Sequence, residues 1–474
     1  MIFRRFYDRD LAQASFLVGC SKTKKALVVD PRRDYQVYLD YARAQGLRVE
    51  VVAETHIHAD YLSGARELAA AIGATLVVST EGGTDWQYSG LQSFEQRLLQ
   101  DGERFAVGKV HVEAVHTPGH TPEHLSYAFY DDETDAVSLI LTGDFLFVGT
   151  PGRPDLLDTT GIEKGSMKKT AAVLFDSLKS FVDRVPHDVP IWPGHGAGSA
   201  CGRSLGALPC TTLGYELKHR PWGAFMRSED REGFIEYILE GQPDSPTYFG
   251  RMKEWNRDGF PLRNVQRRPP RLTRSYFPTA LENGAIAVDL RSREDFSDGH
   301  LKSAIHLPLG PKLATWAGWV MPEPESIVLI TDETTSADEA GDILLRIGQD
   351  DFVGFIPFSD LEDHRDVVKM PAVEAEEALE IWQKEAARFI DVRSKNEFLE
   401  GHIPQAQHFP ITTFQEVLAD IPRGQPLVVY CGSGARAAVA ASILQRQGGE
   451  DVVYFEGSMG AWRENNYPEQ TPDK

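Results

Sequence analysis

Short hydrophobic runs alternate with helical or polar segments through the N-terminal third of the chain. Their aliphatic and β-branched residues, bounded by glycine, proline or charged positions, predict strands. These predicted strands are 16–20, 26–30, 48–53, 75–79, 110–115, 125–130 and 139–142. Helical patterns occupy 35–46 and 62–72, and Gly73 ends the second of them. This alternation of strands and helices predicts a layered α/β domain.

Candidate metal ligands follow several of these predicted strands. After the apolar run 51–53 the chain reads Thr-His-Ile-His-Ala-Asp, which includes His56, His58 and Asp60. A strand ending there would place the two histidines on one side, and the next turn would bring Asp60 to them. Further donors occupy similar positions downstream: His116, His120, Asp144 and His195. The sequence therefore predicts a metal site assembled from loops spread along the chain.

The last 200 or so residues contain an internal repeat. The Asp-x-Arg run at 287–291 is matched at 389–393, and Phe296 recurs as Phe398, an offset of 102 residues. The same offset relates five further positions to their counterparts: Gly299, His300, Ala304, His306 and Pro308. Each copy has the pattern strand, loop, strand, helix, which predicts two small α/β domains with parallel sheets.

The second copy carries a thiol in a short glycine-containing loop. After the predicted strand 426–430 comes Cys431-Gly432-Ser433-Gly434-Ala435-Arg436, followed by a predicted helix over 437–447. Converging backbone N–H groups and the helix dipole stabilise a thiolate or the outer sulfur of a persulfide. Arg436 can orient the oxygens of sulfite or thiosulfate. Four residues separate the cysteine from the arginine, whereas tyrosine phosphatases need five, so sulfur transfer is favoured over phosphate hydrolysis.

The first copy lacks this chemistry. Thr331 stands at the position of Cys431, Asp332 and Glu333 follow it, and Ser336 replaces the arginine. Two carboxylates would repel an anionic substrate. We expect this copy to be inactive and to serve as a spacer or docking surface.

The Arg- and Pro-rich segment 263–274 has the composition of an extended linker. It divides the chain into a metal-binding domain over 1–262, a first copy over 275–368 and a second copy over 369–474.

Composition excludes several classes of partner. The formal net charge of -21 disfavours nucleic acid and anionic membranes. No hydrophobic run is long enough to span a bilayer, and residues 1–10 do not have the pattern of a signal peptide. Four scattered cysteines fit free thiols in a reducing cytoplasm. We expect a cytoplasmic homo-oligomer, although the sequence does not set the number of subunits.

The metal-ligand segment resembles the metallo-β-lactamase superfamily, whose pattern is His-x-His-x-Asp-His. The resemblance implies an αββα sandwich. Asp60 and His195 match positions that hold a second metal in dinuclear zinc members. Tyr61, however, stands where the pattern has its last histidine. A phenol is a poor substitute for a neutral imidazole on zinc, so Tyr61 argues against a second metal.

The domain looks like the persulfide dioxygenase branch of that superfamily, on the strength of Gly-His-Thr-Pro at 119–122 and Gly-Arg-Pro-Asp at 152–155. This resemblance implies one Fe(II) per chain held by His56, His120 and Asp144, with zinc as the alternative metal. Two imidazoles and one carboxylate, with positions left open, suit ferrous iron that activates oxygen.

Other side chains are candidates for the substrate pocket or for hydrogen bonds that support the ligands. They are His58, Asp60, Tyr61, Arg153, Asp155, His195 and Cys201. For His58 and His195 a purely structural role is an open alternative. Cys201 follows His195 by six residues, and its thiol could either exchange sulfur with substrate or be buried. His116 is interpreted as an ordinary strand-end histidine.

Both copies of the repeat resemble rhodanese domains through Asp-x-Arg and Phe-x-x-Gly-His. Their histidines match structural rhodanese positions, which makes a metal site there improbable. The order of the three domains is similar to bacterial sulfide-detoxifying dioxygenase–rhodanese fusions. That resemblance implies oxidation of a low-molecular-weight thiol persulfide by O2 to sulfite, and formation or use of thiosulfate at Cys431.

Two alternatives remain. One is a glyoxalase II-type hydrolase that cleaves a thioester with zinc-activated hydroxide. The other is a persulfide carrier or sensor whose metal domain has lost turnover.

Overall fold

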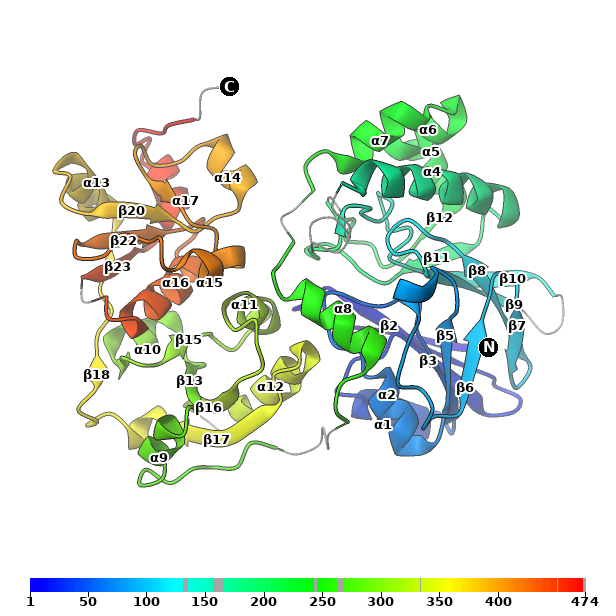
Figure 1. The fold of residues 1–474 in the computed structure, drawn as a ribbon, viewed down its shortest axis with the longest axis horizontal. Helices are drawn as coiled ribbons and strands as arrows, with labels where there is room; N and C mark the ends of the chain where they lie inside the picture. The colour runs from blue at the N-terminus through cyan, green and yellow to red at the C-terminus, as the bar shows by residue number, and fades with distance from the viewer. Residues whose placement is uncertain are drawn as a thin grey trace. The chain divides into compact units, whose positions relative to one another are not determined.

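The computed structural model describes residues 1–130, 135–156, 165–203, 205–242, 245–262, 268–332, 334–449 and 451–471. The chain forms two compact units, Met1–Gln266 and Arg267–Lys474. In Figure 1 unit 1 runs from blue to green and unit 2 from green to red. Positions 263–267 of the predicted linker lie outside the described residues.

The described part of unit 1 contains two six-stranded sheets, ordered β1-β2-β3-β4-β5-β6 and β12-β11-β10-β9-β8-β7. The strands of the first are β1 (Ile2–Tyr7), β2 (Ala14–Gly19), β3 (Lys25–Val29), β4 (Arg48–Ala53), β5 (Thr75–Ser79) and β6 (Gln96–Leu99). Those of the second are β7 (Arg104–Val107), β8 (Val110–His116), β9 (Leu125–Tyr130), β10 (Val137–Gly143), β11 (Pro190–Pro193) and β12 (Thr211–Thr212).

Helices cover the outer faces of these sheets, as Figure 1 shows. On the first sheet these are α1 (Gln36–Ala44) and α2 (Ala65–Ile72), and on the second they are α4 (Met167–Arg184), α5 (Leu213–His219), α6 (Pro221–Ser228) and α7 (Arg231–Leu239). Unit 1 also contains η1 (Thr84–Trp86) and α8 (Phe249–Asp258). The long α4 ends in Arg184, a cation in the last turn that favours the helix dipole.

Alternation along the strands produces the layers of unit 1. Phe16 and Val18 of β2 belong to the core between the two sheets, together with residues of β8 and β9. Leu17 points to the other side, into a core shared with α1 and α2. Ile140 of β10 packs with Leu174 of α4 in a third core. Since successive strand side chains face opposite ways, the layers are helix, sheet, sheet, helix, the order that the αββα resemblance implies.

The predicted strands of unit 1 are present, with ends displaced by a few residues, and those at 48–53, 75–79 and 125–130 match β4, β5 and β9. Strands β1, β6, β7 and β12, at the ends of the sheets, and the four-residue β11 beside β12 were not predicted. Edge strands are hard to recognise as hydrophobic runs because they keep exposed and charged residues, as in β6, where three of four positions are exposed.

Unit 2 contains two parallel sheets with matching strand orders. They are β15-β13-β16-β17 in the first copy and β21-β20-β22-β23-β19 in the second. The elements of the first copy are α9 (Phe277–Glu282), β13 (Ile286–Asp289), α10 (Arg293–Asp298), β14 (His300–Leu301), β15 (Ile305–His306), α11 (Leu313–Val320), β16 (Ser326–Thr331), α12 (Thr334–Leu344), η2 (Leu345–Ile347), β17 (Asp351–Pro357), η3 (Phe358–Asp360) and β18 (Val367–Val368).

The elements of the second copy are β19 (Ala372–Val373), α13 (Ala375–Gln383), β20 (Arg388–Asp391), α14 (Lys395–Glu400), β21 (Gln407–His408), η4 (Ile411–Thr413), α15 (Phe414–Val417), β22 (Leu427–Tyr430), α16 (Ala435–Arg446), β23 (Val452–Phe455) and α17 (Ser458–Glu464). Helix α16 begins two residues before its predicted start.

The repeated histidines are packing residues in both copies. In the first copy the ring of Phe296 stacks on His300 at 3.8 Å and on His306 at 4.5 Å between centroids. The ring of Phe398 makes the equivalent stacks at the same two distances. Each histidine ring also bonds a backbone carbonyl of its own copy. These contacts account for the Phe-x-x-Gly-His signature without a metal.

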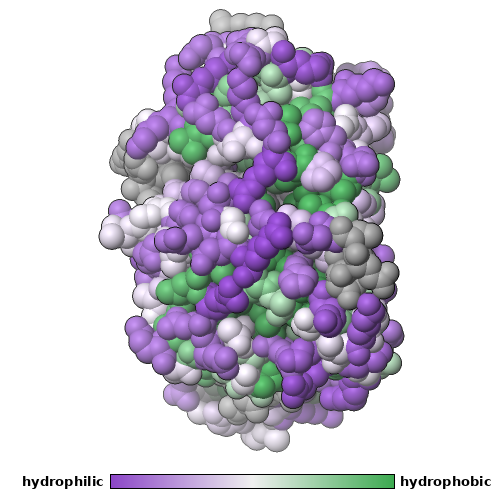
Figure 2. Space-filling view, turned by 90° about the vertical axis from the view of Figure 1, so that its right-hand side faces the viewer, coloured by the Kyte–Doolittle hydropathy of each residue, from purple (hydrophilic) through white to green (hydrophobic). Residues whose placement is uncertain are grey.

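Hydrophilic residues cover most of the face shown in Figure 2, and hydrophobic ones lie between them in smaller patches. No helix in the described ranges is long and apolar enough to cross a bilayer.

The layered core predicts a sharp contrast between neighbouring positions on α4. Leu178 is fully buried and Val173 is 36% exposed. Leu178→Ala should reduce the free energy of unfolding of unit 1 by about 2–5 kcal/mol, because it removes buried methyl groups and leaves a cavity. Val173→Ala should change that free energy of unfolding by no more than about 0.5 kcal/mol. Denaturant unfolding followed by circular dichroism measures both, and equal losses would contradict this assignment of the core.

Candidate metal centre and persulfide loop

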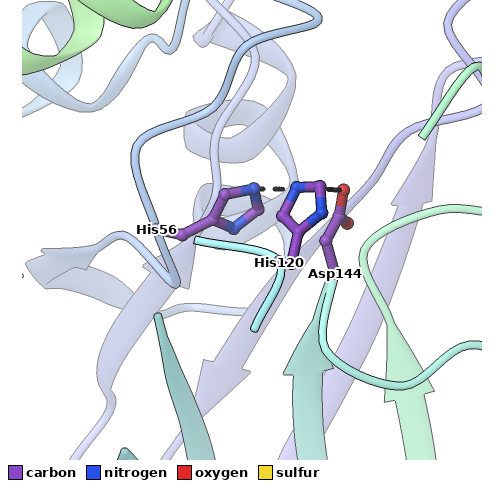
Figure 3. A group of neighbouring side chains, drawn as sticks. All are labelled: His56, His120 and Asp144. Carbon is purple, nitrogen blue, oxygen red and sulfur yellow. Dashed lines mark ion pairs between the residues drawn. The ribbon is translucent and has the colours of Figure 1, made fainter. Parts of the chain in front are cut away.

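Three loops at one edge of the unit 1 sandwich bring His56, His120 and Asp144 together (Figure 3). All three side chains are buried, and one donor atom from each lies within 4.8 Å of the other two. Oδ2 of Asp144 is 3.5 Å from Nε2 of His120 and 3.9 Å from Nε2 of His56. These separations are too long for hydrogen bonds but suit ligands of one cation, since metal–ligand bonds are about 2.0–2.2 Å.

Hydrogen bonds on the far side of each imidazole aim its free nitrogen at this point. His120 donates Nδ1–H to the carbonyl of Arg153 at 3.1 Å. His56 donates Nδ1–H to Thr55 Oγ1 at 2.9 Å, and that hydroxyl donates to Asp30. Such contacts fix the tautomer that leaves Nε2 as a ligand atom. Nε2 of His56 and Oδ2 of Asp144 are buried without a hydrogen-bond partner in the described structure.

The protonation states also fit a metal. Burial lowers the pKa of His56 well below its usual range, and nearby His58 lowers it further. Burial likewise lowers the pKa of His120, although Asp144 partly opposes this. Both imidazoles are therefore neutral, which metal binding requires. The residues present fit a divalent cation.

His195 connects the two aspartates of the region. Its Nδ1 lies 2.7 Å from Asp144 Oδ1, and its Nε2 lies 2.8 Å from Asp60 Oδ2. Burial opposes the charged ring, but the carboxylates of Asp144 and Asp60 outweigh it and raise the pKa of His195 to about 10. An imidazolium that donates from both nitrogens has no lone pair for a metal. It holds Asp144 so that Oδ2 stays free.

His58 faces a different group from His56. Its Nε2 is 3.2 Å from Asp30 Oδ1 and 3.2 Å from Glu54 Oε2. Burial disfavours its charge, yet these two carboxylates raise the pKa of His58 well above its usual range. The Nε2 of His58 therefore faces two carboxylates and not the point where His56, His120 and Asp144 meet.

The expected convergence of His56, His58 and Asp60 is met in part. The rings of His56 and His58 lie close together, with centroids 4.1 Å apart. The candidate ligand atoms of the three residues nevertheless fall in three different buried groups, each with donors that could hold a metal ion. Strand β4 ends at Ala53, so the period-two alternation assumed for the segment does not continue through it.

Tyr61 is buried and has its own partners. Its hydroxyl donates to the carbonyl of Asp30 and accepts from Gln13 Nε2, each at 3.2 Å. Its ring lies 4.6 Å from that of His58. Burial raises the pKa of the phenol well above its usual range, so it stays protonated. Tyr61 supports the His58 group and is not part of the metal group.

Helix α8 holds the ligand loop in place. Asn256 donates Nδ2–H to the carbonyls of His58 and Tyr61, at 2.8 and 2.7 Å, and accepts the N–H of Ser63. Tyr248 donates its hydroxyl to the carbonyl of Asp60. Sequence analysis attached no role to this segment, because its contacts cross about 190 residues of chain.

The Gly-Arg-Pro-Asp segment packs against two of the candidate ligands, His120 and Asp144. Arg153 is buried and pairs with both oxygens of Asp155, at 2.8 and 2.6 Å. It also donates to the carbonyl of Ala200. Gly152 packs so closely on Asp144 that a Cβ there would stand 1.9 Å from its carbonyl oxygen. Arg153 and Asp155 therefore act as supports of His120 and Asp144.

The sequence analysis did not identify two residues, His124 and Glu123, that bond to the loops carrying the candidate ligands. His124 accepts the N–H of Asp144 at 3.1 Å, and its ring stacks on His56 at 5.0 Å. It stands directly before strand β9, whereas the other candidates were identified because they follow strands. Glu123 accepts the N–H of Ile57 at 2.7 Å, and burial raises its pKa to about 7. Nothing in the sequence distinguishes it from a surface carboxylate.

Cys201 lies with Asp60 and His195 in a second buried group. Burial, followed by the charges of Asp60 and Asp144, raises the pKa of its thiol well above the usual range. A protonated thiol is a poor nucleophile, which weighs against sulfur exchange at Cys201. His116, as expected, ends strand β8 and bonds the carbonyl of Pro122.

In unit 2 the Cys431 loop has the geometry of an anion cradle. Cys431 is buried at the end of β22, and the N–H of Gly434 points to its Sγ at 3.2 Å. The backbone N–H of Cys431 is held by Ser458 Oγ at 3.0 Å. Gly434 has φ +93° and is followed at once by helix α16. The helix dipole and this N–H stabilise negative charge on sulfur.

Arg436 lies against this loop but is already paired. It makes a bidentate contact with Glu397, at 2.7 and 2.8 Å. Although burial of Glu397 opposes it, this pair lowers the pKa of that carboxyl to about 2. Glu397 and Cys431 together outweigh burial and raise the pKa of Arg436. The guanidinium is thus fixed next to Cys431 by Glu397, with N–H groups remaining for a substrate.

The first copy has neither the cysteine nor the arginine. Thr331 ends β16 where Cys431 follows β22, and Ser336 stands at the arginine position. Glu333 lies outside the described residues.

Comparisons with known proteins identify two kinds of domain. The family model of the metallo-beta-lactamase superfamily matches residues 8–201, and that of the rhodanese-like domain matches residues 374–465. A crystal structure of a metallo-beta-lactamase from Staphylococcus aureus subsp. aureus COL is 35% identical, with a TM-score of 0.65. The match covers 75% of this chain and 99% of that one.

Curated relatives include both hydrolases and persulfide dioxygenases. A hydroxyacylglutathione hydrolase of Polaromonas sp. (strain JS666 / ATCC BAA-500) is 28% identical over 38% of this chain and 61% of its own length. A mitochondrial persulfide dioxygenase of Homo sapiens is 26% identical over 41% of this chain and 68% of its own length. The chain spans about six tenths of the length of the first curated relatives that it matches.

The geometry predicts which residues bind metal. Asp144→Ala should lose most of the divalent metal bound per chain, because it removes one ligand and frees His195 from its partner. His116→Ala should keep it, since His116 is outside the group. Elemental analysis of both variants after identical reconstitution measures this. Full occupancy in Asp144→Ala would exclude the proposed ligand set.

Proposed function

Since the chain belongs to the metallo-beta-lactamase superfamily, we propose that unit 1 is a persulfide dioxygenase that holds one Fe(II) with His56, His120 and Asp144. We propose further that the second copy is a rhodanese that transfers sulfur through Cys431. The observation that carries the first proposal is the donor set. Two neutral imidazoles and one carboxylate meet at a point, while His58 and His195 nearby each face two carboxylates that stabilise the charged ring.

This donor set favours iron over a pair of zinc ions. Two histidines and one carboxylate leave coordination positions open for oxygen and substrate, and ferrous iron bound in this way activates O2. A second metal would need Asp60 and His195, which are bonded to each other, and a histidine at position 61, which is tyrosine. A relative named persulfide dioxygenase supports the proposed activity.

The overall reaction balances as thiol persulfide, O2 and water giving thiol, sulfite and two protons. The chain's own residues orient the ligands: Thr55 and the Arg153 carbonyl hold the two imidazoles, and His195 holds Asp144. Burial of the group excludes bulk water from the reacting sulfur. The low-molecular-weight thiol of the substrate is not specified by these residues.

Sulfur transfer at Cys431 needs no external oxidant. The Cys431 thiolate attacks the outer sulfur of a persulfide, the donor S–S bond breaks, and the donor leaves as a thiolate. The new Cys431 persulfide then passes its outer sulfur to sulfite, which gives thiosulfate and restores the thiolate; the reverse direction is equally balanced. The N–H of Gly434 and Arg436 stabilise the anionic sulfur in each form.

We also propose that the first copy is a rhodanese-like domain without catalytic activity. It shares the strand order of the second copy, and Arg291 binds Asp289 and the carbonyl of Gly299 as Arg393 binds Asp391 and the carbonyl of Gly401. Domain boundaries at 262/263, 274/275 and 368/369, a cytoplasmic location and a homo-oligomeric state remain predictions.

A zinc-dependent thioester hydrolase is the second candidate, because a hydroxyacylglutathione hydrolase is among the relatives. The ion pairs that occupy His58 and His195 weigh against it. A persulfide carrier or sensor without oxygen turnover is the third.

Oxygen consumption separates these candidates. Iron-loaded protein given glutathione persulfide should take up O2 rapidly, and Asp144→Ala should reduce the rate by about 100-fold or more through loss of the ligand. Cys431→Ser should keep oxygen uptake but accumulate sulfite in place of thiosulfate. Zinc binding with thioester cleavage and no oxygen uptake would establish the hydrolase instead.

The acids around His58 should govern metal selectivity. Glu54→Gln removes one negative partner, so His58 loses part of the stabilisation of its charge and becomes available as a ligand. On reconstitution with equal zinc and iron, the bound zinc-to-iron ratio should rise several-fold. Glu81→Gln, which removes a carboxylate 4.0 Å from His116, is the matched control and should leave the ratio unchanged. An unchanged ratio in Glu54→Gln would show that His58 has no influence on the metal.

A further inference from the structure

The inactive first copy reaches the Cys431 loop of the second copy through one side chain. Arg293, the first residue of α10, donates Nη1–H to the carbonyl of Ser433 at 3.3 Å. The same guanidinium pairs with Glu456, which follows β23 of the second copy. Arg293 is therefore fixed between a backbone carbonyl of the loop and a carboxylate beside it.

The bonded carbonyl belongs to the peptide group that faces the sulfur. Ser433 C=O and Gly434 N–H are the two ends of one planar unit, and in a trans peptide they point in opposite directions. The N–H end points to Cys431 Sγ at 3.2 Å, and the carbonyl end accepts from Arg293. Holding one end of a rigid plane sets the direction of the other, and a cation on the carbonyl strengthens the N–H as a donor.

Gly434 makes this approach possible. Its φ is +93°, a conformation that L side chains rarely adopt. A Cβ at this position would also stand 2.7 Å from Arg293 Nη1. The glycine thus serves both the turn of the loop and the close contact with the arginine.

Further hydrogen bonds join the two copies near this contact. His306 donates its N–H to Ser442 on α16 at 3.0 Å, and His300 bonds Gln445 of the same helix at 3.0 Å. Helix α16 begins at the end of the Cys431 loop. Arg293 and the loop are therefore mounted on elements that are packed against each other.

We propose that Arg293 of the inactive copy is a positioning residue for Cys431, which orients the Ser433–Gly434 peptide so that its N–H stabilises the thiolate and the persulfide. This inference rests on the proposed sulfurtransferase function of the second copy. It gives the first copy a direct part in the chemistry of the second, in place of a spacer role.

The test measures turnover and the ionisation of Cys431 in the full chain. Arg293→Met should lower thiosulfate-to-cyanide sulfur transfer about tenfold, and it should raise the pH midpoint of iodoacetamide alkylation at Cys431 by about one unit, because a hydrogen bond to the charged sulfur is weakened. Mass spectrometry of the Cys431 peptide distinguishes it from the other thiols. Arg293→Lys should recover part of both effects.

Arg446→Met is the matched control. Arg446 donates to the carbonyl of Ser303 across the same pair of copies at 3.1 Å but is remote from Cys431 in the fold. It should change neither turnover nor the alkylation midpoint. Glu456→Gln leaves Arg293 in place while weakening its anchor, and should shift both readouts in the same direction by less.

Two results would overturn the proposal. One is an unchanged alkylation midpoint in Arg293→Met and Glu456→Gln. The other is equal losses of turnover and thermal stability in Arg293→Met and Arg446→Met, which would mean that Arg293 only joins the copies. If the wild-type chain transfers no sulfur at all, the proposed function fails, while the alkylation midpoint still tests the role of Arg293.

Discussion

The imidazolium of His195 between the carboxylates of Asp60 and Asp144 is the contact on which the metal group depends. Two buried carboxylates without a cation would be strongly unfavourable, and one shared cation satisfies both. The pair also determines geometry, because binding Oδ1 of Asp144 leaves Oδ2 directed at His56 and His120. In the proposed one-metal site, the same contact would also occupy ligand atoms of Asp60 and His195 that a second metal would require.

The local environment determines which of the buried histidines are neutral and which are charged. His56 and His120 lie 3.9 and 3.5 Å from the carboxylate oxygen of Asp144 that faces them and stay neutral, whereas His58 and His195 each lie within 3.2 Å of two carboxylates and are charged. Burial opposes charge in every case, and the outcome depends on whether an acid lies within hydrogen-bond reach. Two histidines separated by a single residue therefore acquire opposite roles, and Asp30 contributes to both by binding His58 and, through Thr55, by fixing the tautomer of His56.

Hydrophobic periodicity predicted most strands of unit 1, and strand ends predicted where donors would gather. His56, His120 and Asp144 do lie together, and their identity as iron ligands remains a proposal. The partners of these residues could not be predicted, because Asn256 meets the ligand loop only through the fold. A local sequence pattern predicts which residues follow a strand. It does not predict which acid a buried histidine faces, because that depends on bends in a loop that has no periodic structure.

Unit 2 shows how a domain without a nucleophile can still serve a neighbour's chemistry. A peptide N–H directed at sulfur is useful only while its plane is held, and the carbonyl at its other end faces away from the thiol. The Cys431 loop therefore needs a donor from outside its own turn, and Arg293 stands at that place. In the proposed assignment, Thr331 and Ser336 leave the first copy without a nucleophile and its arginine, while α10, where Arg293 is carried, is kept. Loss of one active site and retention of the surrounding fold are therefore compatible within a single chain.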